Sequence, residues 1–445
     1  MTIGEKLYFV RQLRGAFGSI GAIIPTSRYA ARVMAAEVAR RRGPKTILEV
    51  GPGTGAITAA IIKHLGPADR LVLCEINPGF VTYLRQRFER EPAFRRVRDQ
   101  VTLHEMSVTA LEGRALFDNI VSAIPFTACP PDLVEAIFER YRELLRPGGV
   151  LTYIEYAYLR ALKRRLHPAA RAEAEAVSTI LERYIRRYQF RCDTVWRNVP
   201  PAWIRNLRFA GPQPADAWHL VPLEHTHRVA LGDVPVASDA LPLVAGLSGL
   251  GLLLGRRSWR WGLLPLLAAA TSAWFLRDPY RQMTVNPNVA YAASDGRVLA
   301  VERIRDARLG EEEWLRIAVF LSLADVHINR APIAGKVVRV FRESGGYAAA
   351  NRPRAEHNAA QYTVIEGSVG RCVVAQRAGM VARRIVNWSR EGDLLAQGER
   401  FGLIRFGSRT DVYLPAAQVE ACVGPGDRVR AGETIIARYT GDTAR

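Results

Sequence analysis

An acidic residue and three closely spaced glycines between positions 47 and 55 have the types and spacing of a cofactor-binding turn. An apolar run typical of a buried strand ends in Glu49-Val50, and a helix-like stretch from Ala56 to Leu65 follows the turn. The glycines are Gly51, Gly53 and Gly55. Glycine lets the backbone approach a ligand closely, and the first turn of a helix offers free N–H groups. This segment therefore predicts a cofactor site.

Two cofactors fit this turn, and Glu49 favours one of them. Gly51, Gly53 and Ala56 also match the G-x-G-x-x-A pattern of a nicotinamide site, in which an acid such as Glu75 holds a ribose. An acid two residues before the first glycine would repel a pyrophosphate, whereas it suits the methionyl ammonium of S-adenosylmethionine. We therefore predict S-adenosylmethionine as the cofactor. The predicted binding residues are Glu49, Gly51, Gly53, Gly55 and Glu75.

The elements that must position these residues alternate between helical patterns and short β-rich runs. Four strands are predicted: Thr46 to Val50, Leu71 to Cys74, Asn119 to Ala123 and Val150 to Glu155. Strands that alternate with helices indicate a parallel α/β sheet. The glycine turn, Glu75 after the second strand and Pro147-Gly148-Gly149 before a later one resemble the class I methyltransferases. This resemblance implies a Rossmann-like, mostly parallel sheet.

The run Ala123-Ile124-Pro125-Phe126 bears on the methyl acceptor. Ribosomal RNA adenine dimethylases, which this half loosely resembles, carry Asn-x-Pro-Phe/Tyr there, and the asparagine carbonyl polarises the weakly nucleophilic adenine amine. An alkyl amine needs only to lose a proton. The alanine at position 123 therefore favours an aliphatic amine as the acceptor.

Residues 10–207 resemble the soluble-type bacterial phospholipid N-methyltransferases more closely. The matching pieces are Gly21 to Arg28, Val121 to Pro125, Tyr156 and Asn198 to Ala202. The resemblance implies successive methyl transfers from phosphatidylethanolamine to phosphatidylcholine, and it suggests Tyr156 as a residue near the reacting amine. Ser107 stands where the family commonly has an acid, which leaves the adenine contacts open.

A second group of motifs lies in the C-terminal half. Its members are Phe275 to Pro279, Ser294-Asp295-Gly296, Asp325 to Pro332, Ala378 to Val386 and Gly402 to Arg409. Over about residues 270–437 these motifs resemble the phosphatidylserine decarboxylases. The resemblance implies that the chain cuts itself between Gly407 and Ser408, leaving a β chain that ends at 407 and an α chain of residues 408–445. Ser408 then becomes a pyruvoyl group, the electron sink for decarboxylation.

Carried over by position, Asp295 belongs to the self-cleavage machinery and His327 is the proton donor to the carbanion, a task for which histidine has a suitable pKa. The longer bacterial members have a second histidine at the position of Arg330. The shorter members of the family resemble this chain, with an arginine at that position. Arginine cannot act as a base. His327 acting twice, or His357 assisting, are therefore alternatives for the cleavage base. Arg330 and Arg409 are predicted to hold the lipid phosphate or carboxylate, with a structural ion pair as the alternative for Arg330.

Two apolar runs precede this half, Leu241 to Leu254 and Trp261 to Leu276. As helices they would reach roughly 21 and 24 Å, short of the ~30 Å hydrocarbon core of a bilayer. We predict a hairpin that dips into one leaflet, with a pair of buried soluble helices as the alternative. The predicted domains are a methyltransferase (1–210), a linker (211–240), the hairpin (241–276) and an all-β pyruvoyl decarboxylase (277–445).

The amino-acid composition limits the kinds of partner and the cellular location that fit this chain. The 445 residues carry 62 Lys and Arg against 43 Asp and Glu, a net charge of +19, which favours an anionic partner. Five scattered cysteines without a C-x-x-C pair indicate neither disulfides nor a metal site. We predict a bifunctional phospholipid enzyme at the cytoplasmic face of the cell membrane, attached as a peripheral or monotopic protein. Its predicted partners are phospholipids at an anionic surface rather than nucleic acid. A homo-oligomer is also possible. The alternative is a nucleic-acid methyltransferase fused to a non-catalytic, membrane-anchored β domain.

Overall fold

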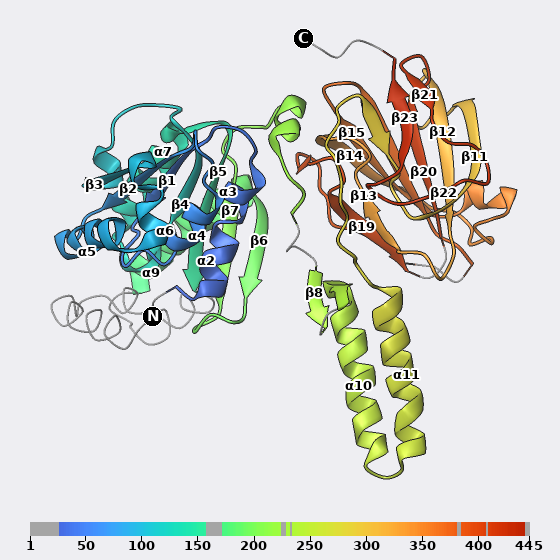
Figure 1. Ribbon diagram of the computed structural model, residues 1–445, viewed down its shortest axis with the longest axis horizontal. Helices are drawn as coiled ribbons and strands as arrows, with labels where there is room; N and C mark the ends of the chain where they lie inside the picture. The colour runs from blue at the N-terminus through green and yellow to red at the C-terminus, as the bar shows by residue number, and fades with distance from the viewer. Residues whose placement is uncertain are drawn as a thin grey trace. The chain divides into compact units, whose positions relative to one another are not determined.

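The computed structural model describes residues 26–156, 171–223, 228–231, 234–380, 384–405 and 408–440. The chain divides into two compact units, Met1–Gly211 and Pro212–Arg445. Each unit has its own hydrophobic cores, and Figure 1 shows the helices and strands of both units. The first unit holds the predicted cofactor turn, and the second holds the hairpin and the predicted self-cleavage motifs.

Unit 1 is built on a seven-stranded sheet with the order β3-β2-β1-β4-β5-β7-β6. Its strands are β1 (Thr46–Val50), β2 (Arg70–Glu75), β3 (Val101–Glu105), β4 (Phe117–Ser122), β5 (Leu145–Tyr156), β6 (Gln189–Val195) and β7 (Ala202–Leu207). The strands from β3 to β5 pair in parallel, whereas β7 is antiparallel to both of its neighbours. The parallel core agrees with the sequence pattern, and the reversed β7 makes the sheet mixed.

Helices bury both faces of this sheet. They are α2 (Arg28–Met34), α3 (Ala36–Arg40), α4 (Thr58–Ile61), α5 (Pro78–Arg90), α6 (Pro92–Arg95), α7 (Pro131–Leu144) and α9 (Arg171–Tyr188). Because side chains alternate along a strand, Ile47 joins the core under α2 to α6, whereas Leu48 joins the core under α7 and α9. The sheet order reverses between β1 and β4, and such a switch point opens a crevice at the carboxyl ends of the strands.

Unit 2 is rich in β-structure. Its strands are β8 (Arg228–Leu231), β9 (Val234–Ala237), β10 (Val289–Tyr291), β11 (Gly296–Arg305), β12 (Glu313–Leu321), β13 (Ile328–Arg330), β14 (Gly335–Glu343), β15 (Ala360–Glu366), β16 (Arg371–Arg377), β17 (Arg384–Asn387), β18 (Leu394–Leu395), β19 (Arg400–Arg405), β20 (Ser408–Pro415), β21 (Val419–Ala421), β22 (Arg428–Val429) and β23 (Ile435–Tyr439). The largest sheet has the order β18-β14-β15-β16-β20-β12-β11-β22, and β13-β19-β17 form a smaller one. These two sheets position the cleavage site.

The described residues of segment 211–240, predicted to be a linker, pack on unit 2 instead. Ala217 and Leu220 join a small core with Leu394 and Ala396. Val236 and Ala237 of β9 join a second core at the base of the helical hairpin. Only a few apolar residues of this segment are buried, and they stand among many Pro and Asp residues. The average composition of the segment therefore did not predict that it packs on unit 2. His225 and His227 lie outside the described residues.

The hairpin consists of α10 (Leu241–Gly255) and α11 (Trp259–Phe275), which project from the β-rich body (Figure 1). Glycines let the two helices approach closely, because a Cβ added at Gly262 would lie 2.6 Å from the Gly251 carbonyl oxygen. Many large apolar side chains remain exposed, among them Leu252 (66%), Leu264 (74%) and Trp261 (70%). Among the described helices, the one starting at Ser238 and ending at Gly255 is long and apolar enough to cross a membrane, which is weak evidence by itself.

Candidate active sites

A cavity of about 440 Å³ opens at the carboxyl ends of β1, β2 and β4 in unit 1. The glycine turn contributes Gly51 and Gly53 to its lining, with φ angles of +69° and +54° that favour glycine. Gly51 N–H also donates to the Cys74 carbonyl oxygen at 2.9 Å, which ties the turn to β2. The sequence prediction of a cofactor turn at this place is consistent with the cavity.

Glu75 lies at the end of β2 and lines the same cavity. Its Oε2 accepts a hydrogen bond from Gly53 N–H at 3.0 Å, and its Oε1 accepts one from Asn77 N–H at 2.9 Å. These two contacts fix the carboxylate at the cavity wall. A fixed carboxylate beside open backbone suits the two hydroxyls of a ribose, as the sequence predicts for Glu75.

Glu49 and Gly55 do not line the cavity, although the sequence groups them with its walls. Glu49 shares the face of β1 that carries Ile47, because side chains alternate along a strand, and it is fully buried. Burial raises the pKa of Glu49 to about 8, and only the nearby Thr58 partly offsets this effect. The structure therefore gives no support to a direct contact between Glu49 and a methionyl ammonium. Gly55 instead permits close packing, since a Cβ there would lie 2.9 Å from Leu84 Cδ2.

The opposite wall of the cavity is apolar and carries one phenol. Ile124 and Pro125 from the predicted acceptor run line it, together with Ile137 of α7 and Tyr156 at the end of β5. Burial raises the pKa of Tyr156, although a hydrogen bond with the side chain of Thr26 acts in the opposite direction. Tyr156 therefore presents a neutral hydroxyl to the cavity at ordinary pH.

Sequence reasoning did not assign several lining residues to the site, among them Ile76 and Asn77. Ile76 is 73% exposed, which is unusual for isoleucine, and it directly follows Glu75. Asn77 caps α5 by accepting from Gly79 N–H at 2.9 Å. The available signal was Asn77-Pro78, which follows Glu75 after one intervening residue and marks a helix start at the cavity edge. Ser107 lines the cavity as well, in the position where an acid was expected.

In unit 2, the predicted cleavage site lies where the chain crosses between two sheets. Ser408 begins β20 and pairs with Leu321 at the end of β12, while Leu403 of β19 pairs with Ile328 of β13. Residues 322–327 therefore form a crossing segment that leads from β12 in the large sheet to β13 in the smaller one. Gly407 itself lies outside the described residues. Ser408 is fully buried, and its hydroxyl has no hydrogen-bond partner within the described part of the chain.

His327 is the last residue of the crossing segment 322–327, and it is buried. Its Nδ1 lies 2.9 Å from the Asp325 carbonyl oxygen, and its ring packs on Phe275 with centroids 4.2 Å apart. A carbonyl oxygen only accepts, so Nδ1 carries the proton and Nε2 keeps its lone pair. Burial lowers the pKa of His327 to about 4. The imidazole is therefore neutral at ordinary pH, which suits a base better than the proton donor that the sequence predicts.

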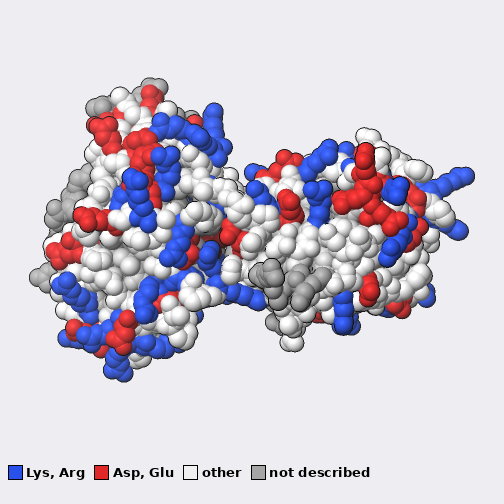
Figure 2. All heavy atoms as spheres, turned by 90° about the horizontal axis from the view of Figure 1, so that it is seen from above, with Lys and Arg blue, Asp and Glu red and all other residues white. Residues whose placement is uncertain are grey.

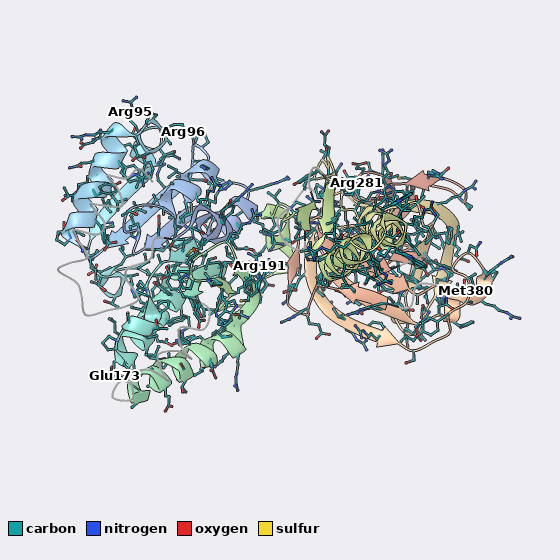
Figure 3. All side chains as sticks on the ribbon, turned by 90° about the horizontal axis from the view of Figure 1, so that it is seen from below. Arg95, Arg96, Glu173, Arg191, Arg281 and Met380 are labelled. Carbon is teal, nitrogen blue, oxygen red and sulfur yellow. The ribbon has the colours of Figure 1, made fainter. Side chains whose placement is uncertain are left out.

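Asp295 directly precedes β11, which lies beside β12 in the large sheet. Its Oδ2 accepts from Arg281 at 2.6 Å, and its Oδ1 accepts from Ala431 N–H at 2.8 Å (Arg281 is labelled in Figure 3). Neighbouring strands thus bring Asp295, the Leu321 end of β12 and Ser408 to the same end of one sheet. A Cβ at Gly296 would lie 2.1 Å from the Phe320 carbonyl oxygen, so glycine is required after Asp295.

Neither arginine predicted to hold the substrate is free to do so. Arg330 pairs with Asp278, whose carboxylate also accepts two hydrogen bonds from Arg228, and Arg400 contacts it as well. Arg409 donates to Asp411 at 2.6 Å and is buried. The alternative of a structural ion pair is therefore the better description of Arg330, and Arg409 takes the same kind of role. Buried arginines need acidic partners, and sequence spacing did not reveal where those partners lie.

His357, the alternative cleavage base, is exposed at the end of a short turn of 3₁₀ helix. His327 is buried among the crossing residues, whereas His357 is not brought to them by any contact in the described residues. The Asp295, His327 and Ser408 positions, predicted from three separate motifs, are brought to one region of the β-structure.

These features define two classes of domain: a class I methyltransferase fold in unit 1, and a β-rich domain in unit 2 in which the described residues of the predicted cleavage machinery come together. The family model for phosphatidylserine decarboxylase matches residues 268–437, and the methyltransferase domain model matches residues 47–149. A phosphatidylserine decarboxylase proenzyme from Beijerinckia indica subsp. indica is 40% identical over 218 residues, 47% of this chain and 92% of that protein. The chain belongs to the phosphatidylserine decarboxylase family and carries a methyltransferase domain in addition.

Methyltransferases are among the solved structures similar to this chain. The O-methyltransferase from Bacillus cereus with bound SAH is 16% identical and aligns over 47% of this chain and 92% of that one, with a TM-score of 0.34. TomG from Streptomyces achromogenes, with bound SAM, is 19% identical over 45% of this chain and 89% of that one, with a TM-score of 0.32. For the carbon methyltransferase CurJ the chain spans about half of that protein, 49%, at 18% identity and a TM-score of 0.28.

Proposed function

We propose that this chain performs consecutive reactions on one membrane lipid. Unit 2 decarboxylates phosphatidylserine, and unit 1 transfers methyl groups from S-adenosylmethionine to the amine of the phosphatidylethanolamine that results. The observation that carries the methylation step is the composition of the unit 1 cavity, which joins the fixed Glu75 carboxylate to an apolar wall with the Tyr156 phenol. The lipid stays in the bilayer between the steps.

The cavity residues fit S-adenosylmethionine, which would supply an electrophilic methyl group. Glu75 would hold the ribose hydroxyls, and the open backbone of Gly51 and Gly53 would lie against the donor. Apolar walls exclude water and disfavour a charged amine, so a bound alkylammonium loses its proton more readily there than in water. The Tyr156 hydroxyl can then accept or donate a hydrogen bond without carrying a charge.

The cavity lining also supports an alkyl amine over adenine. The side chain at position 123, where adenine dimethylases carry asparagine, is a methyl group. Asn77, an amide residue of the lining, already accepts from two backbone N–H groups at the start of α5. On the face seen in Figure 2, basic and acidic side chains are interspersed over both units, without a continuous basic track for a nucleic acid.

Glu75→Ala is expected to weaken S-adenosylmethionine binding by about 10-fold to 100-fold, the range for one hydrogen-bonded charge. Calorimetry measures the affinity, and labelled donor with phosphatidylethanolamine vesicles measures the formation of mono-, di- and trimethylated lipid. Glu105→Ala is a matched control, because Glu105 is the exposed partner of Glu75 in the neighbouring strand. Donor binding without any lipid methylation would refute the proposed acceptor, and labelled adenine in RNA would favour the nucleic-acid alternative.

A loop beside the cavity supports a membrane substrate. Trp196 and Val199, between β6 and β7, are 69% and 82% exposed. Buried Asn198 holds this loop against the cavity by accepting from Ser27 N–H at 2.9 Å, next to the lining residue Thr26. Arg197 lies over the Tyr29 ring. Exposed apolar side chains flanked by arginine suit the interface of an anionic bilayer.

Trp196→Ser with Val199→Ser is expected to raise the KM for phosphatidylethanolamine in anionic vesicles about 10-fold, since both side chains lose apolar contact with lipid. Methylation of a water-soluble short-chain phosphatidylethanolamine should keep its rate. Leu116→Ser is the control, because Leu116 is 39% exposed before β4, away from the carboxyl ends of the strands. Equal losses on vesicles and on soluble lipid would instead indicate damage to the cavity.

A further inference from the structure

Arg277, directly after α11, differs from the other arginines around the unit 2 site. Its guanidinium donates to the Trp274 carbonyl oxygen at 3.0 Å and to the Ala324 carbonyl oxygen at 2.5 Å. It forms no ion pair with a carboxylate in the described residues, whereas Arg281, Arg330 and others nearby do. Three of the five N–H donors of a guanidinium are therefore left for another acceptor.

The acids nearest to Arg277 are occupied by other donors. The carboxylates of Asp295 and Asp325 act on the charge of Arg277 without reaching contact distance. Asp295 accepts from Arg281 and from Ala431 N–H. Asp325 accepts from the backbone N–H and the hydroxyl of Ser322, at 2.8 and 2.6 Å. The charge of Arg277 thus has no intramolecular partner in the described region.

Arg277 is also fixed beside the reacting residues. Ala324, to which it donates, belongs to the 322–327 crossing that ends at His327, and the charge of Arg277 helps to lower the pKa of that histidine. Its guanidinium stacks over the Trp274 ring, 4.3 Å from the centroid, and Trp274 is 49% exposed on α11. Tryptophan with arginine at the end of an apolar helix is typical of the membrane interface. Arg277 therefore lies between the lipid-facing hairpin and His327.

We propose that Arg277 binds an anionic group of the phosphatidylserine headgroup and so sets the position of the substrate beside His327. The headgroup offers two anions of this chemistry, the phosphodiester and the serine carboxylate. A planar guanidinium held by two backbone carbonyls presents its remaining donors in a fixed direction, which matches either anion in a bidentate manner. The proposal takes over the role that the sequence assigned to Arg330 and Arg409, and it rests on the decarboxylase activity of unit 2.

The test uses the full-length protein with Arg277→Gln, Arg277→Lys and the control Arg260→Gln at the far end of α11. We expect Arg277→Gln to mature normally by mass spectrometry and to raise the KM for phosphatidylserine about 10-fold to 100-fold at similar kcat, the range for lost charge-assisted hydrogen bonds. Arg277→Lys should recover part of the loss, because it keeps the charge. Arg260→Gln should behave as the native protein.

Inhibition of decarboxylation by short-chain phosphatidylethanolamine measures binding at the unit 2 site, and it separates the two anions because this product keeps the phosphodiester and lacks the carboxylate. Weaker product binding by Arg277→Gln would assign the phosphodiester, and unchanged binding the carboxylate. An unchanged KM for phosphatidylserine would overturn the proposal. So would a lysine variant no better than the glutamine variant, or a failure of both variants to mature, since each outcome would assign Arg277 a purely structural role.

Discussion

Replacing Ser408 with alanine is expected to leave a single uncut chain of 445 residues without decarboxylase activity. In the self-cleavage that the family implies, the Ser408 hydroxyl would attack the carbonyl carbon of Gly407, the peptide C–N bond would break, and an ester would form. Elimination of that ester releases the β chain, and hydrolysis of the remaining dehydroalanine gives ammonia and the pyruvoyl group. Alanine has no hydroxyl, so the first of these steps cannot occur and the loss should exceed about 1000-fold.

The structure supports Ser408 as the nucleophile independently of the sequence motif. Buried hydroxyls usually have partners, and the Ser408 hydroxyl has none in the described residues. A partner would have to be broken before attack, so the observed arrangement keeps the nucleophile available. The polypeptide around Ser408 is meanwhile anchored, because Arg409 and Asp411 pair with each other within β20.

Denaturing gels and intact mass measure the outcome. The native protein should give two fragments that meet at residues 407 and 408, and Ser408→Ala should give one. Ser389→Ala is the control, since Ser389 is also buried in unit 2 and bonds locally to Asn387. Methyl transfer should survive in Ser408→Ala because the cavity belongs to unit 1. Cleavage of the alanine variant would contradict the assignment of the nucleophile.

The sequence predicted most clearly the features that depend on local order. The strands of unit 1, the turn at Gly51 and Gly53, and the carboxylate of Glu75 follow from alternation and spacing along a short stretch, and the structure has them at one cavity. Asp295, His327 and Ser408 were carried over from family motifs, and their approach depends on pairing between strands distant in sequence. No periodicity encodes that pairing.

Orientation and charge pairing could not be predicted from the sequence. Helices cover both faces of β1, and the spacing of residues did not reveal that Glu49 is absent from the cavity lining and buried in a core, where burial raises its pKa. Arg330 and Arg277 both belong to motifs near the site, but only the folded chain shows that Asp278 pairs with Arg330 and that no acid of the described residues pairs with Arg277. Pairing of buried charges is a property of tertiary contacts.

The base of the hairpin shares one core with residues on either side of His327, so a contact of the proposed membrane hairpin with lipid would be linked to the decarboxylase site. Phe275 and Leu276 of the hairpin pack with Val326 and Ile328 on either side of His327, and with Leu403 of β19. Exposed apolar side chains along α10 and α11 lead toward this core. A lipid whose chains remain in the bilayer would therefore present its headgroup close to His327, without leaving the membrane.

His327→Gln is expected to lower the rate of self-cleavage by about 100-fold to 10,000-fold, the range for a lost general base. The reason is the state of the imidazole in the uncut chain. Its Nδ1–H donates to the Asp325 carbonyl oxygen, and we expect its neutral Nε2 to take the proton that Ser408 releases on attack. Glutamine keeps a polar side chain of similar size but has no basic nitrogen. His357→Gln, on an exposed turn, is the matched control and also tests the alternative base.

The pH dependence of self-cleavage tests the protonation state of His327 directly. The pKa of His327 is lowered to about 4, so the neutral form dominates above that value, and protonation removes the base only as the pH falls toward it. Self-cleavage should therefore keep a constant rate from pH 8 to pH 6, where an ordinary histidine with a pKa near 6.5 would already be mostly protonated. Cleavage followed by intact mass in pulse-labelled protein measures this profile. A rate that halves near pH 6.5 would show that His327 is solvated when it acts, and a normal rate in His327→Gln together with a slow His357→Gln would transfer the role of the base to His357.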